Sequence, residues 1–448
     1  LLGSFEKGLA ADRLKALRSL RDEVFSSSSA HYQKNTARVL LQIMKELVRC
    51  RKSELKQLKL AHDFRTVSLG NPLHVRAELV KYHLIEMPEE WNQIAFDDHV
   101  HDANTKGRKS PTHLIMDAWI KGIRYLTVVY YNYVRPEVIE ELIEASTLLG
   151  IKVQVGIEMS IRFRDKYARF TWEPSGFNDN NSFLKFLRED SVKAFLDEGR
   201  EVSRYQQKYV FDVLGEFNSS HKRAVAEKFG VNLQPLDSDE FRIFVGTGQP
   251  SVLHLGRFIQ NAIQKELDNI GIEALAEGGP GPQEVQDVDG SKSPETPKVT
   301  TIINRFLLPV HNPGVHNPAV PLEDDDPPQL LKCSLSELLN RLLSLHASSK
   351  FTLNLSNLSI QDTLEILYAG AGRVTHVETY NLKNATHGMS SAVTVTGRKQ
   401  LGDTVALKSP KDHYMLVGEL QQALNDDNVI GLKRVIRAII WDHEEQQL

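Results

Sequence analysis

Two histidines separated by one residue, His99 and His101, are the residues whose types and spacing best suit chemistry in this chain. They follow a short apolar run, residues 94–96, that predicts a strand. Side chains two residues apart in an extended segment point to the same side, so both imidazoles can face one site. Imidazole nitrogens bind zinc, and a carboxylate from a neighbouring strand can complete such a site. The alternative is a pair of ordinary polar loop residues, because short motifs often match by chance.

The residues that follow the two histidines repeat a helix and strand order. Ser110 and Pro111 predict the start of one helix, which Gly122 ends. Pro136 opens a second helix, whose apolar residues recur at helical spacing as far as Gly150. An apolar, β-rich run follows each helix. Strands and helices that alternate with short links are typical of right-handed parallel units, so the sequence predicts the α/β class.

Glu158 lies near the end of the second apolar run, residues 151–159. In parallel α/β folds, functional sites lie at the carboxyl ends of strands, where His99, His101 and Glu158 are all expected. These three residues are therefore the candidate metal ligands. The alternative is that Glu158 is a surface carboxylate with no such role.

Two arginines, Arg162 and Arg164, follow Glu158 directly. A guanidinium group can hold a phosphate through two parallel hydrogen bonds, so these residues are candidate phosphate ligands. The alternative is a basic strand or loop edge that faces water.

Several of these segments together resemble the PHP (polymerase and histidinol phosphatase) superfamily. They read FDDHVHDAN, SPTHLIMDAWIKGIRYLTVV and LLGIKVQVGIEMS, and a later one reads GRVTHVETYNLKNA. The family's His-x-His motif is carried by His99 and His101, and its Gly-x-Glu motif by 156–158. Glu378 is the first residue of a segment that matches the family's Glu-x-Tyr-Asn strand. The resemblance implies a TIM-like β/α barrel that holds divalent zinc, manganese or iron and hydrolyses phosphoesters.

Three family motifs are replaced in this chain. Where the family has Thr-Asp-His after its second strand, the chain has Val129, Tyr130 and Tyr131. Tyrosine cannot take the place of aspartate and imidazole in holding a cluster of divalent ions. The other two replacements fall at Asn354 and Asn357, and at Gly397, Arg398 and Lys399.

The chain of 448 residues is long enough for about two or three domains. We expect a PHP-like barrel in two blocks with an arm before it and an insertion inside it. The basic faces of the arm predict either a solvated surface or a docking surface for an acidic partner. The predicted regions are a helical arm at 1–83, the first barrel block at 84–160, a mostly helical insertion at 161–273, a flexible linker rich in Pro, Gly and acids at 274–329, and the second barrel block with closing helices at 330–448.

The overall composition is that of an ordinary soluble protein. A net charge of −4 gives no electrostatic case for binding nucleic acid. Two cysteines far apart in sequence offer no disulfide framework and favour a reducing, cytoplasmic compartment. No apolar run reaches the length of about 18 residues that a membrane span needs, and the first residues do not resemble a signal peptide.

Three further motifs are weaker candidates. Gly246 and Gly248 are expected at a junction between a strand and a helix, where backbone amides can bind phosphate. His254, one turn into the helix that Ser251 caps, is predicted to be buried and hydrogen-bonded. His311 and His316 stand in two His-Asn-Pro repeats but have no carboxylate nearby.

Two functions remain open from the sequence. The first is a metal-dependent phosphoester hydrolase with a phosphorylated small-molecule or nucleotide substrate, in which the ion activates water. The second is an inactive PHP-like barrel that serves as a binding or assembly module, as a homo-oligomer or within a larger assembly. A fold alone does not decide between them.

Overall fold

The protein is described by a computed structural model. The structure describes residues 8–28, 32–50, 53–87, 95–276, 297–321, 326–355 and 358–378, together with Phe5 and a few residues between 419 and 437. The chain divides into two compact units. Unit 1 comprises 1–155 and 179–319, and unit 2 comprises 156–178 and 320–448. The predicted motif residues 397–399 lie outside the described residues.

Unit 1 begins with four helices. They are α1 (Ala10–Ser26), α2 (Gln33–Arg49), α3 (Glu54–Ser68) and α4 (Pro72–Lys81). Val39, Leu40 and Ile43 are buried on α2.

An ion pair joins the helical arm to the following α/β segment. Arg13 on α1 donates to both carboxylate oxygens of Glu141, at 2.8 and 2.5 Å. The hydroxyl of Thr112 donates to the same carboxylate at 2.7 Å. Because Glu141 is buried, these donors offset the free energy lost when its charge leaves water.

The expected alternation of strands and helices is confirmed in the α/β part of unit 1. Its elements are β1 (Phe96–Val100), α5 (Pro111–Lys121), β2 (Tyr125–Tyr131), α6 (Pro136–Leu149) and the start of β3 (Lys152–Phe163). Strands β1 and β2 pair in parallel, with Phe96 opposite Tyr125. Ser110 caps α5 by accepting from the His113 amide, and Gly122 and Gly150 end α5 and α6 at φ of 85° and 65°.

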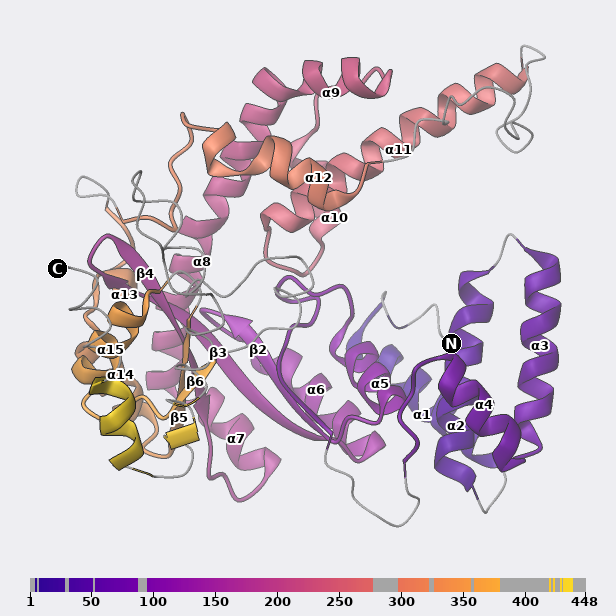
Figure 1. The fold of residues 1–448 in the computed structure, drawn as a ribbon, viewed down its shortest axis with the longest axis horizontal. Helices are drawn as coiled ribbons and strands as arrows, with labels where there is room; N and C mark the ends of the chain where they lie inside the picture. Colours follow the sequence, from indigo (N-terminus) through magenta and orange to yellow (C-terminus); the bar gives the residue numbers. More distant parts are fainter. Residues whose placement is uncertain are drawn as a thin grey trace. The chain divides into compact units, whose positions relative to one another are not determined.

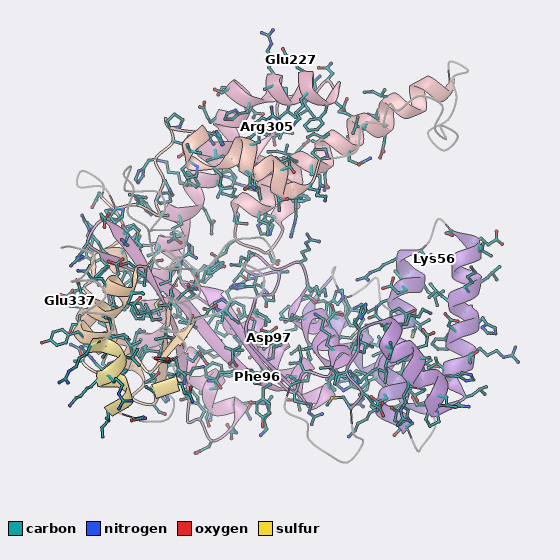
Figure 2. All side chains as sticks on the ribbon, viewed as in Figure 1. Lys56, Phe96, Asp97, Glu227, Arg305 and Glu337 are labelled. Carbon is teal, nitrogen blue, oxygen red and sulfur yellow. The ribbon has the colours of Figure 1, made fainter. Side chains whose placement is uncertain are left out.

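Helices form the rest of unit 1. They are α7 (Asn180–Leu187), α8 (Asp190–Glu216), the π-helix η3 (Phe217–His221), α9 (Lys222–Phe229), α10 (Ser238–Val245), α11 (Val252–Ala276), α12 (Val299–Ile302), the π-helix η4 (Ile303–Leu307) and the 3₁₀ helix η5 (Pro309–His311). Helices α8 to α12 lie together in Figure 1. Their apolar side chains and those of η3 and η4 share one core. Figure 2 shows the side chains that fill this cluster, with Glu227 on α9 and Arg305 on η4 labelled.

Two segments whose apolar and β-branched residues favour strands, 241–245 and 301–310, are helical in this cluster. The segment 241–245 belongs to α10, whose N-cap Asp237 accepts from the amides of Asp239 and Glu240. Acidic residues in the first turn also favour the helix. The segment 301–310 is helical over most of its length and buries Ile302 and Phe306 in the core. Tertiary packing here outweighs the strand preference of β-branched residues.

Unit 2 contains the rest of β3 with β4 (Lys166–Pro174), β5 (Ser349–Asn354) and β6 (His376–Glu378). It also contains the helices α13 (Gln329–Lys332), α14 (Leu335–Leu345) and α15 (Ile360–Ala369). Ser334 and Ser359 begin α14 and α15 with full capping boxes.

The strand arrangement confirms the α/β class and corrects the expectation of parallel pairing throughout. Strand β4 pairs antiparallel with both β3 and β5, whereas β5 and β6 are parallel. Residues 161–174, predicted at the start of a helical insertion, therefore form strands. The strand order is β1 to β6, and the described residues contain no pairing that closes the sheet into a barrel.

The sheet of unit 2 has one apolar and one polar face. Ile157, Met159, Phe170, Trp172 and Leu353 are buried on the apolar face. The register places Glu158, Thr171 and Asn354 among the residues of the other face, because side chains alternate along each strand. In the described part of the chain, no helix combines the length and apolar character needed to cross a membrane.

We predict that Gly199→Ala destabilises the protein by at least about 2 kcal/mol, because a Cβ at Gly199 would lie 2.0 Å from the Asn132 carbonyl oxygen. Gly215→Ala on the same helix is the control. Nothing lies within 4 Å of a Cβ at Gly215, so helix propensity should stabilise this variant by about 0.5 kcal/mol. Urea unfolding measures both changes, and equal effects would contradict the close approach.

We also predict that the protein loses stability on acidification. Burial lowers the pKa of His113 to about 3 and that of His254 to about 4, below the usual 6.5. Their contribution is present above pH 6.5 and is lost as pH falls toward the folded-state values, because the unfolded chain takes up protons first. Between these limits the unfolding free energy should fall by roughly 1 kcal/mol per pH unit for each histidine.

Urea titrations across this pH range test that expectation. The double variant His113→Gln, His254→Gln should show a shallower pH dependence than the wild type. His62→Gln, which alters an exposed side chain, is the control for the replacement of a histidine as such. A double variant with the wild-type slope would disprove the assignment.

Candidate functional site

His99 and His101 lie together at the carboxyl end of β1, within unit 1. His99 is in the strand and His101 follows it directly. Their ring centroids are 5.0 Å apart, with the rings at 69°. Figure 2 labels Phe96 and Asp97, the first residues of the strand that ends at these histidines.

Both ring nitrogens of His101 have hydrogen-bond partners in the protein. Nδ1 lies 2.7 Å from the Val129 carbonyl oxygen, and Nε2 lies 3.2 Å from the Tyr131 hydroxyl. A carbonyl only accepts, so Nδ1 carries the hydrogen and Nε2 accepts from the Tyr131 hydroxyl. The lone pair with which His101 would bind a metal is therefore engaged by Tyr131.

Tyr130 makes an equivalent contact to the residue that follows His101. Its hydroxyl donates to Asp102 Oδ2 at 2.8 Å, and the Asn104 amide donates to Oδ1 at 2.8 Å. Burial raises the pKa of Asp102 to about 6 despite these bonds, and it raises the pKa of Tyr130 well above its usual value. Tyr130 and Tyr131 thus both bond to the segment that contains His101 and Asp102.

Gln249 ties this strand end to the helical part of unit 1. Its side-chain amide donates to the Tyr131 carbonyl at 3.0 Å, and its backbone amide donates to the Thr105 carbonyl at 3.0 Å. Its side-chain oxygen accepts from Ser203 on α8 at 3.2 Å. Asn132, with φ of 60°, also donates to Ser203, at 3.1 Å. This buried network fixes the loops after β1 and β2.

The glycine-rich turn before Gln249 does not present its amides outward as predicted. The Gly246 amide donates to the Arg242 carbonyl at 3.0 Å, and the Gly248 amide donates to the Val245 carbonyl at 3.4 Å. A Cβ at Gly248 would meet the Ala103 carbonyl oxygen at 2.7 Å. The glycine therefore serves the close approach of two loops.

Glu158 lies on the polar face of the sheet in unit 2, where it is buried. Its nearest described cation is Arg169 of β4, at 3.8 Å. Arg169 is opposite Asn354 in the register, and the Asn354 side chain donates to Glu378 at 3.3 Å. The Gly-x-Glu and Glu-x-Tyr-Asn matches thus both contribute a carboxylate to one face of unit 2.

The two candidate phosphate ligands differ in their surroundings. Arg164, in the turn between β3 and β4, donates to Glu365 of α15 at 2.5 Å and lies 4.0 Å from Asp362. Arg162 is exposed on β3. A phosphate at Arg164 would have to compete with the Glu365 carboxylate, whereas Arg162 meets no such competitor among the described contacts.

No group of three or more His, Cys, Asp or Glu side chains is arranged to hold a metal ion in the described part of the chain. The histidine pair belongs to unit 1 and Glu158 to unit 2, so their convergence stays a prediction. The prediction for His254 is confirmed, because it is buried and its Nδ1 lies 3.0 Å from the Ser251 hydroxyl. His311 contacts the Asn304 carbonyl oxygen, and His316 contacts the Tyr205 hydroxyl.

Sequence reasoning missed Asp102 and Gln249 as parts of these clusters. Tyr130 and Tyr131 stand where the family that the sequence resembles has Asp-His, which was visible in the sequence. The hydrogen bonds of these tyrosines were not, because their partners lie about 30 residues earlier in the chain.

No family of known sequences and no curated protein matches this chain. A solved structure named as a metal-dependent phosphoesterase from Bifidobacterium adolescentis is similar over 69% of this chain and 85% of its own, with 13% sequence identity and a TM-score of 0.38. An amidohydrolase from Chromobacterium violaceum is similar over 70% of this chain and 92% of its own, with 13% identity and a TM-score of 0.37. Similarity this weak does not transfer an activity.

We predict that Tyr130→Phe destabilises the protein by about 1–3 kcal/mol, because the buried Asp102 carboxyl loses a donor. Tyr133→Phe, which alters a tyrosine two residues beyond the end of β2, should change stability by less than about 0.5 kcal/mol. In a double-mutant cycle with Asp102→Asn, the two effects should not add, because the residues are in contact. Additive effects would show that the hydrogen bond does not stabilise the fold.

Proposed function

We propose that this chain is a PHP-like α/β protein that serves as a binding or assembly module and does not hydrolyse phosphoesters. The observation that supports this proposal is the engagement of both His101 ring nitrogens, by the Val129 carbonyl and the Tyr131 hydroxyl. A histidine binds a metal through a ring lone pair, and here that lone pair already accepts a hydrogen bond.

The donor set around the histidines does not fit the metal that the family resemblance implies. Tyr131 brings a hydroxyl donor to the position where the family supplies a further ligand. Neutral phenol binds divalent ions far less well than imidazole or carboxylate. Asp102, which follows His101 directly, is buried and already accepts three hydrogen bonds from Tyr130 and Asn104. Metal binding here would require several of these bonds to break.

The second candidate function is the metal-dependent hydrolase. The close approach of His99 and His101, with ring centroids 5.0 Å apart, favours it. In this proposal His99, His101 and Glu158 would hold one zinc, manganese or iron ion, and Arg162 or Arg164 would bind the phosphate of a small-molecule or nucleotide substrate. When bound, the ion would supply an activated water.

The module proposal extends to a second copy of the chain or a larger assembly as partner. Four leucines on α3, directly after it and on α4 are exposed: Leu55, Leu58, Leu69 and Leu73. Leucine side chains of globular proteins are more often buried. Sizing of the full chain by light scattering tests self-association.

We predict that the purified full chain, equilibrated with zinc or manganese and then desalted, retains far less than one ion per chain. The double variant His99→Ala, His101→Ala should retain the same amount, as should the control His62→Ala, which removes an exposed histidine. Turnover of a generic aryl phosphate should likewise be equal in the wild type and the double variant. One ion per chain that is lost in the double variant, together with metal-dependent turnover, would establish the hydrolase instead.

A further variant tests the role of Tyr131 directly. Tyr131→Phe removes the donor to His101 Nε2 and leaves the ring in place. If the hydroxyl blocks metal binding, this variant should retain more zinc than the wild type, and Tyr133→Phe should not. Equal retention in all three proteins would show that Tyr131 is not the obstacle.

A further inference from the structure

A cavity of about 380 Å³ lies beside the loop after β1, within unit 1. One wall is this loop, with Ala103 and Arg108, and the other is formed by α10 and α11. Its volume falls within the range of small-molecule sites. The phosphate-binding residues that the sequence predicted are not among the residues that line this cavity.

Two guanidinium groups line this cavity, from Arg108 and Arg257. Its described lining residues include no aspartate or glutamate. Arg257 lies on α11, and its Nε is buried and has no hydrogen-bond partner. The protein thus leaves part of the hydrogen-bonding capacity of Arg257 unused, and an anion bonded to its guanidinium group would offset this cost.

The charges around Arg257 favour an anion. Burial, together with the nearby charge of Arg108, lowers the pKa of Arg257 to about 10. The cation remains charged at neutral pH but lies near a like charge in a partly desolvated position. An anion between the two guanidinium groups would relieve this repulsion.

The other lining residues provide neutral and apolar groups. His254 is buried with a pKa lowered to about 4, so it lines the cavity as a neutral ring. Asn261 adds a side-chain amide one turn beyond Arg257. Phe244 is 38% exposed, and its ring can pack against an apolar or aromatic body. The cavity therefore combines a cationic part with an aromatic part.

The loop wall is held in place before any ligand binds. The Gln249 amide donates to the Thr105 carbonyl at 3.0 Å, and the Gly107 amide donates to the Asp102 carbonyl at 2.8 Å. Gly107 also packs so closely that a Cβ would lie 2.3 Å from the His101 carbonyl oxygen. A preformed wall lowers the entropy lost on binding.

A neighbouring cavity of about 500 Å³ is a weaker candidate. Arg242 lines it, but this arginine pairs with Asp239 at 3.1 Å and lies over the Phe211 ring at 4.8 Å. Its charge is thus already compensated, which makes Arg242 a suitable control.

We propose that the cavity lined by Arg108 and Arg257 binds a small phosphate monoester with an aromatic or apolar body, the chemistry of a nucleoside monophosphate. Arg257 would donate from α11 and Arg108 from the loop, with Phe244 against the ligand body. This inference concerns residues other than His99 and His101, so it holds whether or not those histidines bind a metal.

Isothermal titration of the full chain with adenosine monophosphate tests the proposal. We expect binding that weakens with added salt, because part of the attraction is between charges. Ribose 5-phosphate should bind more weakly because it lacks the base, and adenosine should not bind measurably. Absence of adenosine monophosphate binding at millimolar concentration, or adenosine binding as tightly as the monophosphate, would overturn the proposal.

The arginine variants locate the site. Arg108→Gln and Arg257→Gln should each weaken binding by about tenfold or more, because each removes a charge-assisted contact. Arg242→Gln should leave the affinity unchanged. Arg108 is exposed, so its variant should keep the wild-type melting temperature even if replacement of the half-buried Arg257 lowers it. Unchanged affinity in Arg108→Gln, or loss only in Arg242→Gln, would place the ligand elsewhere and reject the cavity.

Discussion

Buried polar groups at the ends of β1 and β2 must find partners inside the protein, and this requirement shapes unit 1. His101 and Asp102 find theirs in Tyr131 and Tyr130. Gln249 satisfies the backbone of both strand ends and reaches α8 through Ser203. Because an unpaired buried group costs more free energy than a typical hydrogen bond contributes, each member of this network depends on the others.

The same requirement explains why ligand binding is expected at the cavity beside Arg257 and not at His101. Around His101 every polar atom named above has a partner, so a ligand must first displace protein contacts. At Arg257 the buried Nε has no protein partner, so the guanidinium group has hydrogen-bonding capacity that the protein does not use. Binding is expected where a preformed site lacks partners, and not where the protein supplies them itself.

Much of the local structure was predictable from residues near in sequence. Ser110, Gly122 and Gly150 place the ends of α5 and α6 correctly, because caps act within one helical turn. The apolar run 241–245 predicts a strand, but the N-cap Asp237 and the acids that follow it favour the helix α10 that the structure contains. The antiparallel pairing of β4 with β5 joins residues about 180 positions apart and leaves no local pattern.

The candidate sites were predictable only in part for the same reason. The sequence places His99 and His101 at a strand end through a short motif, and β1 ends there. The partners that decide what His101 can do come from β2, and no spacing rule connects them. Arg108 and Arg257 are separated by about 150 residues and share a cavity through the packing of α11 against a loop.

The turn between β3 and β4 has a consequence for how the chain folds. Phe163 pairs with Lys166 across Arg164 and Asp165, and Arg164 has φ of 56°. A slip of one residue in this hairpin would exchange the two faces and turn the large aromatic side chains toward the carboxylates. The contact of Arg164 with Glu365 on α15 forms only when the hairpin has its native register, so it adds to the specification of strand alignment.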